Sequence, residues 1–202
     1  SVFVATVYML KVQNIKRMLA YSSIEHMGLV MLGVAAGGIG YYAAILHLIL
    51  HAFTKASMFF QIGQVYRIYK SKHISDTGNY FKYNLAGALA LLLAFICATA
   101  MPPSGLFISE FMIFRSLFEG HHLFLFIVVL LLLTMIIWAL GKSIFRLLFL
   151  PPVNFDETRA GKVSAGESVS QFILLGLVIY LGFNPPLQMV ELIQDAVKNL
   201  PH

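Results

Sequence analysis

The sequence predicts an all-α protein: a polytopic bundle of transmembrane helices with about five full spans, a partial span at its start and one helix broken by proline. Apolar residue types make up 59% of the 202 residues and charged types only 11%, whereas soluble domains average roughly 45–50% apolar and 25% charged. The mean hydropathy is +0.81. The apolar residues form runs about long enough to cross a bilayer, and basic residues gather between these runs. A soluble core could not bury this much apolar surface.

The apolar runs divide the chain into a transmembrane bundle, residues 1–183, and a tail, residues 184–202. Residues 1–10 resemble the end of a span. Apolar residues from Leu187 to Leu200 alternate with charges at helical spacing, which predicts an interfacial helix in the tail. The full spans are expected at about residues 18–36, 41–69, 85–118, 123–150 and 169–183.

The third predicted span is interrupted by Met-Pro-Pro-Ser-Gly at residues 101–105. A proline inside a helix removes a backbone donor and clashes with the carbonyl four residues before it. The residue before a proline also avoids helical geometry. Pro102 and Pro103 therefore predict one membrane helix in two halves. Broken helices recur in transporters, where their freed backbone groups hold ions or water.

The basic residues predict the orientation of the bundle. Three alternate connections carry all of the basic residues that flank the spans, and the opposite connections, GGIGYY and EGHH, carry no Lys or Arg. By the positive-inside rule the basic side is cytoplasmic, so we expect a multi-pass protein of the inner (cytoplasmic) membrane of the cell. The net charge of +5 does not form the single basic patch that nucleic acid binding requires. The flanking basic residues are Lys11, Lys16, Arg17, Arg67, Lys70, Lys72, Lys82, Arg146, Arg159 and Lys162.

Cysteine usage and the start of the chain limit other interpretations. Cys97 is the single cysteine and lies in an apolar run, so we expect neither a disulfide framework nor a cysteine metal site. The chain begins at Ser1 inside an apolar stretch, without a basic region or a cleavage site, and we expect a fragment or a truncated product. Since no nucleotide loop, hydrolase triad or haem-attachment motif occurs, we expect no cofactor and no redox centre in this chain.

Three ionisable residues lie at i, i+4 and i+8 in the second predicted full span: His47, His51 and Lys55. In a helix they share one face. That face should not meet lipid, because a charge near the bilayer centre costs about 2.5–3.5 kcal/mol on insertion scales. Since histidine titrates near neutral pH, such a row could pass protons. Two alternatives stay open: a polar seam that only holds helices together, and a metal site on the histidine pair, for which further ligands are missing.

Glu110 follows the proline break in an otherwise apolar segment. A lone carboxylate at membrane depth is costly unless it is paired or protonated, so we interpret the break and Glu110 as one ion-handling feature. The alternative is a position near the far interface, paired with Arg115. Glu25 and His26 lie about two turns into the first predicted full span. They could pass protons to the row from the cytoplasmic side, or they could be satisfied interface residues.

A family resemblance is carried by three successive stretches, NIKRMLAYSSIEHMG, HLILHAFTKASMFFQIGQ and MPPSGLFISEFMIF. The chain resembles the antiporter-like membrane subunits of respiratory complex I, group 4 membrane hydrogenases and Mrp-type cation/proton antiporters. SSIEHMG resembles in particular the form found in the F subunits of the hydrogenase-4 (formate hydrogenlyase) type. The resemblance covers nearly the whole chain and implies the second repeat of an inverted-repeat transporter fold. It also implies that Lys55 is the family's central lysine and that Glu110 occupies the broken-helix position.

The resemblance implies a proton-translocating membrane subunit of a respiratory-type oxidoreductase, such as a membrane hydrogenase or an NADH dehydrogenase-like complex. Redox chemistry in partner subunits would drive protons through the network of Lys55 and Glu110. The implied partners are other membrane subunits, a peripheral redox arm and the lipid bilayer. The family's first repeat, with its Glu and Lys pair and its PxHxWLPxAH signature, is absent, so we expect only the C-terminal portion of a proton path. Two functions remain as alternatives: a subunit of a multisubunit sodium/proton antiporter, and a non-transporting membrane scaffold.

Overall fold

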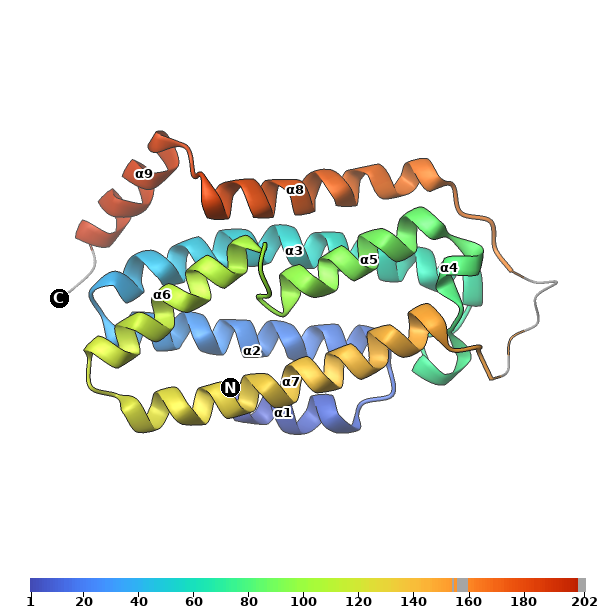
Figure 1. Cartoon of the computed structure of the whole chain (residues 1–202), viewed down its shortest axis with the longest axis horizontal. Coiled ribbons are helices and arrows are strands. Elements are labelled where there is room, and N and C mark those ends of the chain that lie inside the picture. The colour runs from blue at the N-terminus through green and yellow to red at the C-terminus, as the bar shows by residue number, and fades with distance from the viewer. Residues whose placement is uncertain (154, 156–159, 200–202) are drawn as a thin grey trace.

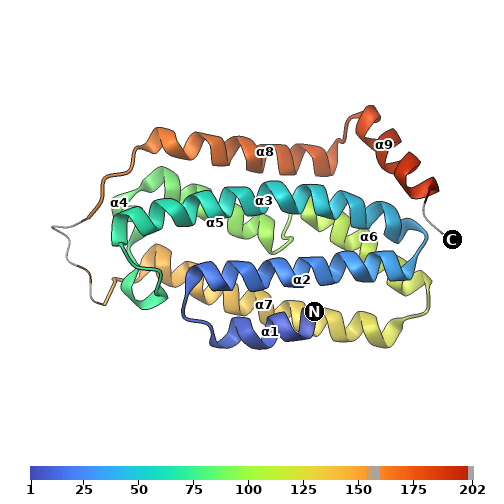
Figure 2. The same cartoon turned by 180° about the vertical axis from the view of Figure 1, so that it is seen from behind.

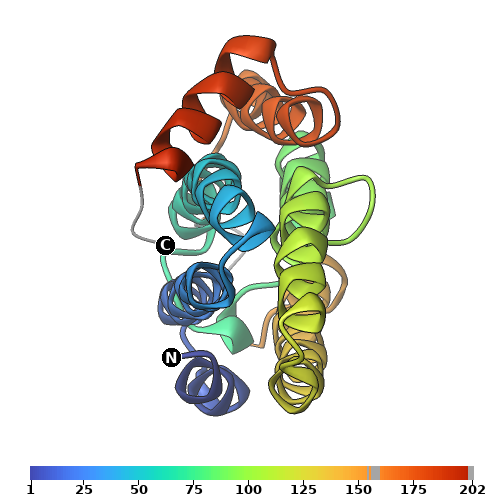
Figure 3. The ribbon, with the colours of Figure 1, turned by 90° about the vertical axis from the view of Figure 1, so that its left-hand side faces the viewer.

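The computed structural model describes residues 1–153, 155 and 160–199, and every regular element in these ranges is a helix. Three antiparallel helices at the start of the chain form one layer, and the broken helix with the helix after it forms a second (Figure 1, Figure 3). Figure 2 shows the first layer from its outer face. The elements are α1 (Val2–Lys11), α2 (Ile15–Ala36), α3 (Ile39–Tyr69), η1 (Ile74–Asp76), α4 (Tyr80–Tyr83), α5 (Leu85–Ala98), α6 (Gly105–Glu119), α7 (Leu123–Phe149), η3 (Ala165–Ser168), α8 (Val169–Phe183) and α9 (Leu187–Lys198).

Helix α3 is the centre of the bundle. It packs against α2 in its own layer, against α5 and α6 in the second layer and against α8, which covers one side of both (Figure 3). Its 31 residues make it about 46 Å long at 1.5 Å per residue, more than the roughly 30 Å of a bilayer core. Groups in the middle of α3 are therefore enclosed by helices on several sides.

Helix α2 begins at Ile15, before the start at residue 18 that the sequence suggested, because Asn14 caps it. The Asn14 side chain accepts hydrogen bonds from the backbone nitrogens of Lys16 and Arg17 at 3.1 and 3.2 Å. At the other end, Gly37 and Gly38 have φ values of 72° and 54°, a conformation that glycine adopts without steric cost. This sharp turn lets α3 run back along α2.

The broken helix consists of α5 and α6, which lie end to end across the bundle (Figure 1). The break begins after Ala98, earlier than the predicted residue 101, because Ala98 is the residue four positions before Pro102. The Pro102 ring would clash with the Ala98 carbonyl in a continuous helix and offers it no N–H. Ser104 caps the second half by accepting a hydrogen bond from the Leu106 nitrogen at 3.1 Å.

Four helical stretches in the described ranges are long and apolar enough to cross a membrane. Helices α5 and α6 have 14 and 15 residues, so neither half is a full crossing alone, but the pair provides a fifth. The outer surface is apolar as a lipid-facing surface must be; Phe124 on α7 is 82% exposed. The prediction of an all-α membrane bundle with one proline-broken helix is confirmed. The four stretches are Ile15–Ala36, Ile39–Tyr69, Leu123–Phe149 and Ala165–Phe183.

The two ends of the bundle differ in charge. The C-terminal ends of α1, α3 and α7, which carry Lys11, Arg67 and Arg146, lie at one end of the bundle (Figure 1). Helix α9 lies at the opposite end and exposes Leu187 and Leu192. Its location in the membrane interface stays a prediction. Two residues named in the sequence analysis, Arg159 and Leu200, lie outside the described residues.

Candidate functional site

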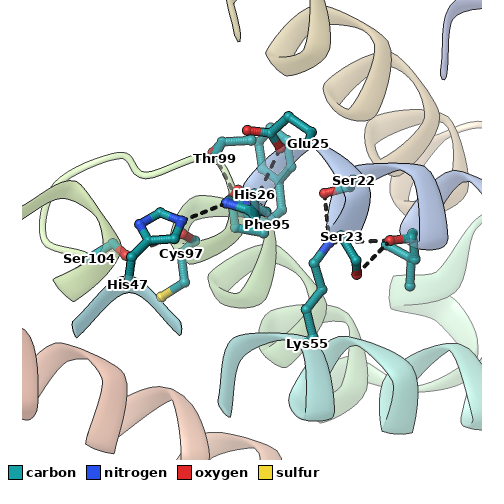
Figure 4. A network of polar contacts seen from close by, with 12 residues as sticks. Ser22, Ser23, Glu25, His26, His47, Lys55, Phe95, Cys97, Thr99 and Ser104 are labelled. Carbon is teal, nitrogen blue, oxygen red and sulfur yellow. Dashed lines mark hydrogen bonds and ion pairs between the residues drawn. The ribbon is translucent and has the colours of Figure 1, made fainter. Parts of the chain in front are cut away.

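The ionisable row of α3 is buried inside the bundle. His47, His51 and Lys55 expose 0%, 7% and 6% of their surface. Glu25 and His26 of α2 face this row and are each 2% exposed, so both are enclosed by the helices of the bundle. Figure 4 shows four of these side chains, all but His51, meeting between α2, α3 and the broken helix. The structure thus brings together five of the six predicted site residues.

Lys55 is held at one end of the site by oxygen atoms of α2. Its Nζ donates to Ser22 Oγ at 2.6 Å and to the Leu19 carbonyl oxygen at 3.3 Å (Figure 4). An ammonium group this deep needs such oxygen ligands, because removing it from water costs several kcal/mol. The ammonium is also within electrostatic reach of the Glu25 carboxylate, so the charge of each group affects the other.

A chain of hydrogen bonds crosses the middle of the site. His26 Nε2 lies 3.1 Å from the Ala98 carbonyl oxygen, and His26 Nδ1 lies 3.0 Å from His47 Nε2 (Figure 4). His47 Nδ1 lies 2.9 Å from Ser109 Oγ. The chain therefore links α2, α3 and both halves of the broken helix. All four groups are side chains or backbone atoms buried from solvent.

The Ala98 carbonyl fixes the hydrogen positions in this chain. A neutral histidine has one N–H and one bare nitrogen, and a carbonyl only accepts, so His26 Nε2 carries the hydrogen that points at Ala98. His26 Nδ1 must then accept from His47 Nε2, which leaves His47 Nδ1 as an acceptor for the Ser109 hydroxyl. These positions follow from the bonding pattern, as tautomers generally do.

Ser109 can serve His47 in either protonation state. Its hydroxyl has one hydrogen and two acceptors within reach, His47 Nδ1 at 2.9 Å and the Leu106 carbonyl oxygen at 3.0 Å. When the hydrogen points at His47, that ring is neutral; when it points at Leu106, the Ser109 oxygen can accept from a protonated His47. The site therefore tolerates a proton arriving at His47 without leaving a polar atom unpaired.

His51 lies beside the hydrogen-bonded chain without joining it. Its ring centroid is 4.6 Å from that of His26, and its Nδ1 is buried without a hydrogen-bond partner among the described residues. A buried nitrogen with no partner is uncommon and costs about 1–3 kcal/mol. The unpaired nitrogen therefore makes His51 a candidate for a functional role.

Glu110 is the site residue that the structure sets apart. It is not paired with Arg115, so that alternative is wrong; Arg115 Nε instead donates to Glu119 Oε1 at 2.8 Å. Within the described ranges, Glu110 has no hydrogen-bond or ion-pair partner, although it follows Ser109 directly and lies within electrostatic reach of Glu25. It lines a pocket of about 250 Å³ between the break, α6 and α7, whose walls include Phe111.

The two histidines of the row lie ring against ring. The His47 and His51 rings have centroids 6.4 Å apart and face each other as a stack. No group of three or more His, Cys, Asp or Glu side chains in the described part of the chain is placed to share an ion. The two rings are instead arranged around His26.

A second polar cluster, which the sequence analysis missed, lies further along α3 toward the basic end. In this amide cluster Tyr80 donates to Gln61 at 3.1 Å, and Asn84 donates to Gln64 at 2.9 Å. Ser168 joins the two glutamines, accepting from Gln61 and donating to Gln64, both at 3.2 Å. Burial raises the pKa of the Tyr80 phenol, which therefore stays a donor. The sequence did contain a signal for this cluster, because Gln61 and Gln64 are three positions apart and lie on one side of an otherwise apolar helix.

The chain is similar to known proteins in both sequence and structure. The family model described as "NADH:quinone oxidoreductase/Mrp antiporter, TM" matches residues 1–136. The "Hydrogenase-4 component F homolog" of Methylacidiphilum infernorum is 32% identical over 97% of this chain, which covers 40% of that protein. NADH-quinone oxidoreductase subunit M of Escherichia coli K12 is 28% identical over 93% of the chain, covering 37% of that subunit. The chain thus spans about two fifths of the length of these relatives.

Solved structures share the fold at low sequence identity. A chain of the Mrp complex from Dietzia has a TM-score of 0.87 at 16% identity, covering 98% of this chain and 45% of that one. A chain of respiratory complex I from Thermus thermophilus with bound NADH has a TM-score of 0.79 at 18% identity, with 100% and 44% coverage. The family resemblance predicted from the three sequence stretches is confirmed. Because the family model matches more than half of its residues, the chain belongs to the NADH:quinone oxidoreductase/Mrp antiporter transmembrane family.

Proposed function

We propose that this chain moves protons through a membrane subunit of a respiratory-type oxidoreductase, either a membrane hydrogenase or an NADH dehydrogenase-like complex. The observation that carries the proposal is the buried chain from Ser109 through His47 and His26 to the Ala98 carbonyl. Hydrogen-bonded imidazoles can each accept a proton on one nitrogen and release another from the other nitrogen. The proposed proton-handling residues are Glu25, His26, His47, His51, Lys55 and Glu110, of which His47 and His26 form the hydrogen-bonded chain itself.

The proposed transfer begins when a proton from the Glu110 side reaches His47 Nδ1. His47 passes the hydrogen on its Nε2 to His26 Nδ1 across 3.0 Å. His26 then releases its Nε2 hydrogen to the Glu25 carboxylate, whose Oε2 is 3.6 Å away. One proton enters and one leaves, and both histidines end neutral in the opposite tautomer. His26 now presents a bare nitrogen to the Ala98 carbonyl, an arrangement that favours return to the starting tautomer.

In this scheme the charge of Lys55 controls whether Glu25 holds a proton. While it is an ammonium held by Ser22, it stabilises a negative Glu25 across the site. When Lys55 loses its proton, a charged Glu25 becomes costlier and takes up a proton more readily. A change in the charge of Lys55 would therefore switch Glu25 between releasing and accepting a proton.

The partners and location belong to the same proposal. The similarity to a hydrogenase-4 component and to a subunit of NADH-quinone oxidoreductase supports assembly with other membrane subunits and a peripheral redox arm. Redox cofactors would reside in those partners. The basic ends of α1, α3 and α7 would face the cytoplasm from the inner membrane.

The function is tested by Lys55→Met in the complete membrane complex, with proton uptake measured in inverted vesicles while electron transfer runs. Methionine fills much of the lysine volume without charge, so we expect electron transfer and assembly to continue while pumping is lost. Lys11→Met, at the exposed end of α1, is the matched control and should pump normally. Normal pumping by Lys55→Met would contradict the proposal and favour the alternative of a non-transporting membrane scaffold. Uptake that requires sodium would favour the antiporter function, to which the Mrp-like fold points.

A further inference from the structure

Two cations near the basic end of α7 have no acidic partner among the residues that the structure describes. Lys142 and Arg146 are one helical turn apart, so they lie on the same face. Arg146 Nε is buried without a hydrogen-bond partner, and Lys142 Nζ lies 5.3 Å above the Trp138 ring. In the same described ranges, other cations do form ion pairs: Arg67 with Glu167, Arg115 with Glu119, and Lys198 with Asp195.

Two hollows of different chemistry meet at this basic pair. Between α1 and α7, a hollow of about 170 Å³ is lined by polar groups that include Gln13, Ser143 and both cations. Between α5 and α7, which lie side by side (Figure 1), a groove of about 540 Å³ is lined almost wholly by apolar side chains. Trp138 and Lys142 line both. A polar hollow therefore continues directly into an apolar groove.

The groove runs from the basic end of the bundle toward its middle. Its α7 wall extends from Phe145 inward to Ile137, and its α5 wall extends from Leu92 inward to Ile96. Arg146 and Ile137 are nine positions apart in α7, which is about 14 Å along the helix axis. One leaflet of a bilayer core is about 15 Å thick. The groove therefore has the depth and direction of a lipid acyl chain.

We propose that this site holds one anionic phospholipid, with its phosphate between Lys142 and Arg146 and an acyl chain in the groove between α5 and α7. Charge complementarity selects the lipid, because two cations without acidic partners in the described part of the chain favour a net negative headgroup. A zwitterionic headgroup brings its own ammonium group to the same position. Free phosphate would fill the hollow but leave the apolar groove empty.

The test uses the whole membrane complex that contains the chain, placed in phosphatidylcholine vesicles doped with phosphatidylglycerol that carries a photoactivatable group on one acyl chain. Cross-linked peptides are identified by mass spectrometry while the fraction of probe lipid is varied. We expect labelling of α5 and α7 along the groove. The variant Lys142→Gln/Arg146→Gln should raise the half-saturating lipid fraction about thirtyfold, since each cation near an anionic headgroup contributes about a factor of five.

Two further variants separate the headgroup site from the acyl groove. A Cβ at Gly141 would lie 3.4 Å from Phe95 Cζ, an ordinary contact, so Gly141→Leu should fold, fill the groove and reduce labelling with both cations kept. Arg17→Gln/Lys70→Gln removes two exposed cations elsewhere and should leave labelling unchanged.

Competition in the unmodified complex tests the identity of the occupant without any variant. Unlabelled phosphatidylglycerol should displace the probe, and neither phosphatidylcholine nor inorganic phosphate should do so. Displacement by inorganic phosphate would assign the hollow to a free anion, and equal displacement by phosphatidylcholine would show that charge does not select the lipid. Labelling confined to a helix of another subunit would assign the groove to a protein partner. Each of these results would overturn the proposal.

Discussion

Replacing His26 separates the structural role of the histidine chain from its proposed proton transfer. His26→Gln keeps an amide N–H for the Ala98 carbonyl and an oxygen for His47 Nε2, but it provides no basic nitrogen that can take up a proton. His26→Leu removes both hydrogen bonds. His26→Leu should therefore be less stable than His26→Gln, whereas both variants should lose proton pumping.

The stability difference can be worked from the two bonds that His26 makes. In membrane proteins a side-chain hydrogen bond contributes about 0.6 kcal/mol on average, so losing two costs at least about 1 kcal/mol. If the Ala98 carbonyl and His47 Nε2 are both left unpaired, the cost rises to about 2–6 kcal/mol. His26→Leu should therefore melt at a clearly lower temperature. His26→Gln should stay within about 1 kcal/mol of the unmodified protein.

The functional effect should be the same for both variants. Because a positioned proton carrier typically speeds proton transfer by about a hundredfold or more, its removal should reduce pumping to background. The assay measures proton uptake and electron transfer in the same inverted vesicles and reports protons moved per electron. Melting of the purified complex gives the stability. If His26→Gln pumps at the normal ratio, His26 only holds the helices together and the proposed transfer through it is refuted.

Three further predictions concern other parts of the bundle. Gly182→Leu should separate α8 from α6 and lower the melting temperature, because a Cβ at Gly182 overlaps the backbone at the start of α6; Gly176→Leu, with nothing within 4 Å, is the control. Ser22→Ala removes the hydroxyl that Lys55 contacts at 2.6 Å and should slow pumping about ten- to a hundredfold, since hydrogen bonds to charged groups contribute about 1.5–3 kcal/mol. An unchanged rate would show that Lys55 does not need this hydrogen bond. Tyr80→Phe removes two hydrogen bonds of the amide cluster and should destabilise the complex by about 1–2 kcal/mol. Pumping should stay normal. Loss of pumping would place this cluster in the proton path.

Helical periodicity was enough to predict one side of the site. The i, i+4, i+8 spacing put His47, His51 and Lys55 on one face of a helix, and the cost of burying charge in lipid turned that face inward. The proline pair likewise predicted the broken helix. Both arguments use only neighbours in sequence, which is why they succeeded.

Contacts between helices could not be predicted in this way. Whether His26 reaches His47 depends on how α2 rotates and crosses over α3, and periodicity within one helix does not set that angle. Asn84 and Ser168 join the amide cluster from outside the predicted spans. Ser109 was overlooked because a serine in an apolar helix most often bonds its own backbone, as its contact with Leu106 shows.

The start of the break at Ala98 connects the proline pair to the proposed chemistry. In an unbroken helix the Ala98 carbonyl would accept from the nitrogen of residue 102, but Pro102 has no hydrogen there. The vacant carbonyl is filled by His26 Nε2, and that bond decides which nitrogen of His26 faces His47 as an acceptor. The broken helix therefore gives the histidine chain a preferred direction, from His47 toward His26. An apolar residue at position 26 would leave the Ala98 carbonyl without a hydrogen-bond donor. In an unbroken helix, His26 would lose the acceptor that sets its tautomer. The broken helix and the histidine chain therefore depend on each other.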